Sequence, residues 1–135
     1  MADSAALIRE FYECFVRADS DGVLALLTPD VAWHAPDCLP YGGTYHGHDG
    51  VLRYAAAAAE WYDFIFVEVE DVAELAPGRA VTVGAFGGRT KVTGVEFRVP
   101  FCQTWEFRGD QGAVLRYWND SGAVLRALGV PPRAA

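Results

Sequence analysis

A change of hydrophobic period near residue 63 constrains this chain more than any other feature. Before it, the apolar residues between 4 and 18 recur at helical spacing and form one stripe. After it, segments rich in β-branched and aromatic residues alternate with short turns that contain Gly. Because short turns join antiparallel strands, the second half predicts an antiparallel sheet, and the helices of the first half must cover one of its faces.

The expected elements follow this division. Upstream, the sequence predicts helices over 4–18, 23–27 and 49–61, a strand over 31–35 and a Pro- and Gly-rich loop over 36–50. Downstream, it predicts strands over 64–70, 80–89, 95–107 and 113–119 and a closing helix over 121–128. We therefore expect a single α+β domain of residues 1–135, with its core at about residues 4–129.

Composition and charge limit the classes of partner that this chain can bind. The chain has a net charge of −7 and a single lysine, Lys91, so its electrostatic field disfavours nucleic acid. No apolar stretch approaches the ~20 residues of a membrane span, and the N-terminus lacks the pattern of a signal peptide. Cys14, Cys38 and Cys102 show no paired spacing. We expect a cytoplasmic protein with reduced thiols and no membrane partner.

Three local motifs add to this order of elements. Phe11-Tyr12 precedes an Asp-containing break, Tyr41 to Gly50 reads Tyr-Gly-Gly-Thr-Tyr-His-Gly-His-Asp-Gly, and Trp105-Glu106-Phe107 leads to Tyr117-Trp118-Asn119-Asp120. Together they resemble the SnoaL-like members of the nuclear-transport-factor-2-like superfamily, over about residues 4–129. The resemblance implies a cone, in which a strongly curved sheet packs on the three N-terminal helices and encloses a pocket. It also implies a homodimer that forms through the outer face of the sheet. Cys102 and Thr104 on that face are uncharged and can be buried against a partner.

The superfamily contains polyketide cyclases, ketosteroid isomerases, epoxide hydrolases and non-catalytic binding domains, so the fold alone does not give the function. The isomerases use an oxyanion-holding tyrosine, a basic aspartate and a protonated aspartate, and these positions fall on Phe11, Ala35 and Gln103, none of which can play those parts. If the alignment were shifted by one residue, Tyr12 would occupy the tyrosine position. The isomerase interpretation is disfavoured all the same. In SnoaL-like cyclases an aspartate at the end of the last strand moves the proton, and Asp120 matches it; the neighbouring histidine position falls on Gln103.

Strand alternation predicts which of these side chains share a face. If Asp120 and Gln103 face the cavity, Trp118 and Arg116 on the last strand and Trp105 on the long strand face it too. Trp33 and Ala35 share a face of the first strand, from which His34 points away. The cavity would be a flat aromatic slot suited to a small apolar or aromatic molecule.

Each candidate also has an ordinary structural interpretation. Asp120 could cap the last helix, and Arg116 could pair with an acid such as Glu96 or turn outward. His34 could be structural or a pH-active catalyst, and the Trp and Phe residues could be core. His46 and His48 have no third ligand at a suitable spacing, so no metal is expected.

Two functions stay open. In the first, the protein is a cofactor-independent enzyme acting on an apolar carbonyl or polyketide-like substrate, with Asp120, Gln103 and His34 as catalytic candidates. The alternative is a non-catalytic binding domain or dimeric scaffold for an apolar metabolite. In either case the ligand-binding candidates are Phe11, Trp33, Tyr45, Trp105, Arg116 and Trp118.

Overall fold

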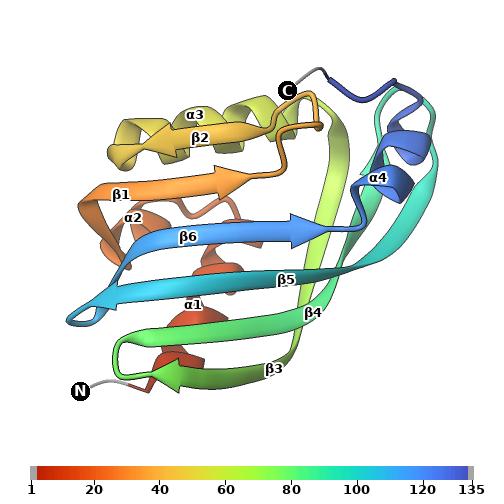
Figure 1. Ribbon diagram of the computed structural model, residues 1–135. Helices are drawn as coiled ribbons and strands as arrows, with labels where there is room; N and C mark the ends of the chain where they lie inside the picture. Colours follow the sequence, from red (N-terminus) through yellow and green to blue (C-terminus); the bar gives the residue numbers. More distant parts are fainter. Residues whose placement is uncertain (1–2, 134–135) are drawn as a thin grey trace.

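The computed structural model describes residues 3–133. Within these residues, four helices and six strands follow one another (Figure 1). The elements are α1 (Ser4–Val16), α2 (Ser20–Ala25), β1 (Leu27–Ala35), β2 (Gly43–His46), α3 (Gly47–Ala59), β3 (Tyr62–Ala76), β4 (Arg79–Thr90), β5 (Glu96–Arg108), β6 (Gln111–Asn119) and α4 (Ser121–Leu128). None of the helices within residues 3–133 is long and apolar enough to cross a bilayer.

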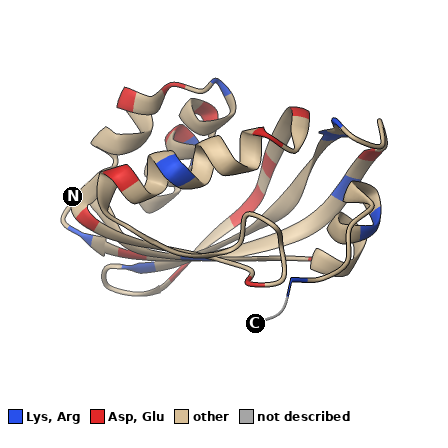
Figure 2. Ribbon diagram, turned by 90° about the horizontal axis from the view of Figure 1, so that it is seen from above, with Lys and Arg blue, Asp and Glu red and all other residues tan. Residues whose placement is uncertain are grey.

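The strands form one curved sheet in the order β2-β1-β6-β5-β4-β3. The strands of the second half pair antiparallel, as their short turns predict, and β1 joins β6 in the only parallel pairing within the described residues. Figure 2 shows α1, α2 and α3 on one side of the sheet. The α+β class and the mostly antiparallel curved sheet packed on N-terminal helices are therefore confirmed.

Sharp bending of β4 depends on glycine. A Cβ on Gly84 would lie 1.9 Å from the carbonyl oxygen of Glu68 on β3, and one on Gly87 would lie 2.2 Å from that of Phe97 on β5. Any side chain at these positions would push the neighbouring strands apart. Register shifts between β3 and β4 add to the bend. The curvature wraps the sheet around the helices and creates the space between them.

The first half of the chain differs from the prediction in two places. The second helix begins at Ser20 because Asp19 caps it, its carboxylate accepting a hydrogen bond from Gly22 N at 3.0 Å. It ends at Ala25, and β1 begins at Leu27, before Pro29. In addition, the predicted loop over 36–50 contains β2, which pairs with β1 from Ala35↔Gly43 to Ala32↔His46. That strand is too short and too rich in Gly for its pattern to stand out.

The core lies between the helices and the inner face of the sheet. One row of inner side chains crosses four strands and is at least 98% buried: Ala80, Trp105, Leu115 and Trp33. Phe11 of α1 packs on this row, with its ring centroid 5.0 Å from Trp105 and 5.8 Å from Trp33. These residues belong to the hydrophobic core and do not line the pocket described below.

Candidate functional site

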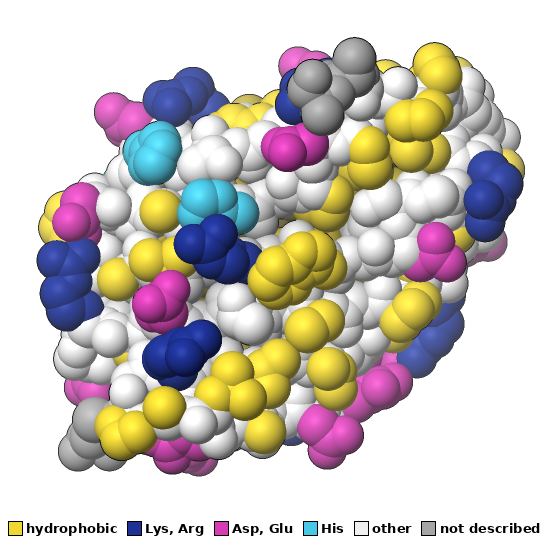
Figure 3. Space-filling model, in the orientation of Figure 1, with side chains coloured by type: hydrophobic (Ala, Val, Ile, Leu, Met, Phe, Trp, Pro, Cys, Tyr) yellow, Lys and Arg dark blue, Asp and Glu magenta, His cyan; other side chains and the backbone are white. Residues whose placement is uncertain are grey.

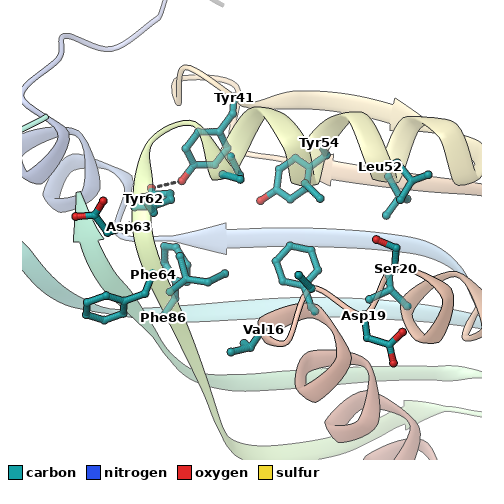
Figure 4. Close-up of a pocket in the computed structure, with 18 residues that line it drawn as sticks. Val16, Asp19, Ser20, Tyr41, Leu52, Tyr54, Tyr62, Asp63, Phe64 and Phe86 are labelled. Atoms are coloured by element: carbon teal, nitrogen blue, oxygen red, sulfur yellow. Dashed lines mark hydrogen bonds between the residues drawn. The ribbon is translucent and has the colours of Figure 1, made fainter. Parts of the chain in front are cut away.

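A pocket of about 310 Å³ opens between the helices and the start of β3 (Figure 4). Its wall is aliphatic or aromatic apart from Asp19, Ser20, Asp63 and the tyrosine hydroxyls. A volume of this size is at the lower end for small-molecule sites. The lining residues are Phe15, Val16, Ala18, Asp19, Ser20, Val23, Tyr41, Val51, Leu52, Tyr54, Ala55, Ala58, Ala59, Tyr62, Asp63, Phe64, Ile65 and Phe86.

Three tyrosines from different elements meet at this pocket. Tyr41 comes from the loop before β2, Tyr54 from the buried stripe of α3 and Tyr62 from the first residue of β3. The hydroxyls of Tyr41 and Tyr62 are hydrogen-bonded, as the dashed line in Figure 4 marks. The ring centroid of Tyr41 lies 6.0 Å from that of Tyr54. The three rings thus form one aromatic wall that carries polar groups.

Burial keeps these hydroxyls protonated. It raises the pKa of Tyr62 to about 12, against an ordinary value of 10.0. Burial also raises the pKa of Tyr54 and Tyr41, in each case with further increases from neighbouring tyrosines. At neutral pH all three therefore act as neutral hydrogen-bond donors and acceptors, and none can accept a proton as a base.

The two carboxylates in the pocket wall are already engaged. Asp19 caps α2 and lies 3.6 Å from the Arg17 guanidinium, and Asp63 accepts a hydrogen bond from Arg89 Nε at 3.1 Å. Both are exposed at the rim. Within residues 3–133, no group of three or more His, Cys, Asp or Glu side chains lies close enough together to hold a metal ion.

Unpaired polar groups lie deeper in the sheet. Gln103 is fully buried, and neither its Oε1 nor its Nε2 has a hydrogen-bond partner among the described residues. It stands opposite Tyr117 of β6. The hydroxyl of Tyr12 on α1 is likewise buried without a partner, and its side chain lines a second cavity of about 370 Å³ between α1 and β3. Buried polar groups are normally hydrogen-bonded, so these atoms are available to a bound molecule or to ordered water.

The structure places part of the predicted inner face correctly. Gln103, Trp105, Trp33 and Ala35 all face inward and are buried. Phe11, Trp33 and Trp105 pack against one another in the core and line neither cavity described above. Tyr45 lies behind the tyrosine wall, where its hydroxyl donates to Tyr41 O at 3.0 Å. Their binding roles stay predictions.

The prediction that Trp118 and Arg116 face the cavity is wrong. Gln103 stands opposite Tyr117 and Trp105 opposite Leu115, so in this part of β6 the odd-numbered residues face inward. Trp118 is 49% exposed on the outer face, and Arg116 is exposed beside it. The prediction failed because it fixed the alternation of β6 from Asp120, which lies just beyond the strand.

Asp120 and His34 also lie away from the pocket. Asp120 is exposed and caps α4, its Oδ1 accepting from Ala123 N at 3.1 Å. His34 faces outward, as its alternation with Trp33 predicts, and its Nδ1 is 3.0 Å from Thr44 Oγ1. Partial burial, Arg116 and His46 lower the pKa of His34, and Asp37 opposes them.

Sequence reasoning missed Tyr41, Tyr54 and Tyr62. A signal was present for Tyr54, which follows Val51 at helical spacing and so shares its buried stripe. Tyr41 lies in a segment without periodicity, and Tyr62 lies at the boundary between a helix and a strand. Neither position gives a pattern from which inward orientation could be predicted.

A curved sheet wrapped around three helices, with a pocket at its open end, defines the class of nuclear-transport-factor-2-like folds. The sequence profile of the SnoaL-like domain matches residues 8–117, and the chain therefore belongs to the SnoaL-like family. No curated protein matches the chain significantly.

Solved structures agree with this class. An NTF2-like protein of unknown function from Burkholderia pseudomallei is 30% identical, with a TM-score of 0.87 over 95% of this chain and 98% of that one. TerC, co-crystallised with polyporic acid, is 23% identical, with a TM-score of 0.85 over 93% and 97% of the two chains. A putative polyketide cyclase from Xanthomonas campestris is 19% identical, with a TM-score of 0.78 over 92% and 95%.

Proposed function

We propose that this protein binds a planar, largely apolar small molecule that carries carbonyl or hydroxyl oxygens. The observation that carries the proposal is the wall of Tyr41, Tyr54 and Tyr62 in an otherwise apolar pocket. The rings offer flat surfaces for stacking, and the protonated hydroxyls offer donors for ligand oxygens. Co-crystallisation of the related TerC with polyporic acid supports an aromatic ligand class.

The geometry favours binding over acid/base catalysis. Catalysis on a carbonyl substrate needs a group that accepts a proton, within hydrogen-bond reach of the substrate. The carboxylates in the pocket wall, Asp19 and Asp63, are engaged by Arg17 and Arg89, and Asp120 caps α4 in solvent. Of the two functions left open by the sequence, the non-catalytic one therefore has the stronger support.

A matched pair of probes tests the binding proposal. The protein is titrated with 2-hydroxy-1,4-naphthoquinone and with naphthalene, which has the same fused rings without oxygens. We expect the quinone to bind more tightly, and Tyr54→Phe to reduce that preference two- to twelvefold, the equivalent of one net hydrogen bond of ~0.5–1.5 kcal/mol. Tyr117→Phe is the control, because it removes a buried tyrosine hydroxyl that does not line the pocket.

Two outcomes would contradict the proposal. Equal affinity for the two probes would show that the hydroxyls do not contact ligand oxygens. No saturable binding of either probe, together with no retained ligand in native mass spectrometry of gently purified protein, would leave the pocket without a ligand. For any ligand found in that way, turnover that Asp120→Asn abolishes would support the catalytic alternative instead.

We also propose that the outer face of the sheet forms a homodimer. Val83, Cys102 and Trp118 are neighbours in register across β4, β5 and β6, with Val83 39% and Trp118 49% exposed. Figure 3 shows hydrophobic side chains gathered on this face. Such a row is costly to leave in water and suits a second copy of the same sheet. Sedimentation of the parent protein at micromolar concentration is expected to show a dimer. The Trp118→Glu variant should sediment as a monomer. A monomeric parent protein would overturn the proposal.

A further inference from the structure

The segment that follows α4 returns to the pocket side of the molecule. Gly129 adopts a left-handed conformation (φ 73°) and ends the helix, and Val130 packs against the core. Pro131 and Pro132 then hold the chain extended. As Figure 1 shows, this segment runs from α4 to the loop between β1 and β2. It brings Arg133 to residues that lie more than 90 positions earlier in the sequence.

Arg133 makes three hydrogen bonds to this loop. Its backbone N donates to Cys38 O at 2.9 Å, its Nε to Asp37 O at 3.2 Å and its Nη2 to Gly42 O at 3.1 Å. The guanidinium therefore spans both ends of the segment 37–42. A planar fork with several donors suits this bridging role, whereas a single ammonium group would reach fewer carbonyls.

The bridged segment has a shape that positions Tyr41. Leu39 N donates to Pro36 O and Gly42 N to Leu39 O, which gives two consecutive tight turns. A Cβ on Gly42 would lie 1.8 Å from Pro36 O, so the turns leave no room there. Tyr41 lies within the second turn and reaches inward to the hydroxyl of Tyr62. The position of its ring in the pocket wall depends on the conformation of the segment.

We infer that Arg133 is a positioning residue of the pocket: it straps the 37–42 segment and thereby fixes Tyr41 in the tyrosine wall. Arg133 lines neither of the two cavities and acts through the backbone of that segment. The inference deepens the proposed function and rests on it for the effect on ligand affinity. The effect on the segment and on Tyr41 does not depend on any ligand.

The first experiment measures the segment without ligand. In Arg133→Ala we expect the backbone amides of Leu39 and Gly42 to exchange with deuterium roughly three- to tenfold faster, because side-chain bonds that close the segment are lost. Arg133→Lys should recover part of the protection. Arg126→Ala is the control, since it removes the same charge from the exposed surface of α4. Unchanged exchange in Arg133→Ala, or an equal increase in both alanine variants, would overturn the inference.

The second experiment follows Tyr41 itself. The protein is labelled with 3-fluorotyrosine, and the ¹⁹F resonances are assigned with Tyr12→Phe, Tyr41→Phe and Tyr62→Phe. Arg133→Ala should shift the resonances of Tyr41 and Tyr62 and leave that of Tyr12 in place. If the amides of the 37–42 segment exchange faster but the Tyr41 resonance does not move, Arg133 does not position Tyr41 in the tyrosine wall. The inference would then fail.

The third experiment tests whether the hydrogen bonds from Arg133 to the 37–42 segment affect ligand affinity. Arg133→Ala should weaken 2-hydroxy-1,4-naphthoquinone binding by roughly three- to tenfold, and the loss should not add to that of Tyr41→Phe. If the losses of affinity in Arg133→Ala and Tyr41→Phe add, Arg133 does not act through Tyr41. If the parent protein binds neither probe and retains no ligand, the proposed function fails, while the exchange and fluorine measurements still decide the role of Arg133.

Discussion

The two faces of strands β5 and β6 carry similar residues and have opposite environments. On the inner face, Gln103 and Trp105 are buried opposite Tyr117 and Leu115. On the outer face, Cys102 and Thr104 stand opposite Trp118 and Arg116, the last two of which are exposed. Each face has a tryptophan and hydrogen-bonding side chains, so residue type does not distinguish them. The register of strand pairing does, because a shift of one residue exchanges the faces.

Replacing one tryptophan on each face gives the largest expected contrast. Trp105 is 1% exposed and packs against Phe11 and Phe107, so Trp105→Ala should lower the free energy of unfolding by about 3–5 kcal/mol. Trp118→Ala, at an exposed site, should change the stability of the monomer by less than ~0.5 kcal/mol. Urea denaturation at low protein concentration measures both. Equal losses would mean that the assignment of the faces is wrong.

The same contrast shows how far the sequence could lead. Periodicity was enough for α1, and segments rich in β-branched and aromatic residues between short turns were enough for the four later strands. The motifs around Phe11, Tyr45 and Trp105 were enough for the family. The orientation of β6 was not predictable from its own residues, since Val114, Leu115, Tyr117 and Trp118 are large on both faces. Only its pairing with β5, anchored by Gln103 opposite Tyr117, places Trp118 outside.

The candidate site was harder to predict than the fold for a related reason. Gln103 could be found because it lies on a regular strand, along which the positions of the family's functional residues can be counted. Tyr41 and Tyr62 lie where regular structure begins or ends, and their inward orientation results from contacts between distant segments. The bonds from Arg133 to the 37–42 segment are of this kind. Local pattern carries no information about them.

Alkaline pH probes the inner face through Tyr62. The folded-state pKa of about 12 lies above the ordinary value of 10.0, so the unfolded chain loses this proton first as the pH rises. Stability from this group is complete below pH 10 and is lost by about pH 12, a change of about 3 kcal/mol. Tyr62→Phe should therefore flatten the fall in stability over that window, measured by denaturation at a series of pH values. An unchanged slope would contradict burial of this hydroxyl.

Gln103 allows the polar part of the inner face to be tested. Its amide is buried without partners among residues 3–133, so Gln103→Met, which keeps the length of the side chain, should raise the free energy of unfolding by about 1 kcal/mol. Thr104→Val, one residue along on the outer face, should have an effect within about 0.5 kcal/mol. Thermal and urea unfolding of the ligand-free protein measure both. If Gln103→Met is instead destabilising, the amide has partners in solution, and ordered water in the core would be the reason.

The smallest effect is expected on the outer face, at His34. Partial burial, with the charges of Arg116 and His46, lowers the pKa of this imidazole, while Asp37 opposes the change. As the pH falls through 6.5, the unfolded chain takes up the proton before the folded one does, so the folded state loses stability toward acid pH. The loss should stay within the roughly 0.5 kcal/mol typical of surface sites, because solvent screens a half-buried group. His34→Gln should remove it, seen as a smaller difference between unfolding midpoints at pH 7.5 and pH 5.0. If the pH effect at His34 is as large as that at Tyr62, the outer face is buried in solution. If that large effect disappears in the monomeric Trp118→Glu variant, a second copy of the chain is what buries it.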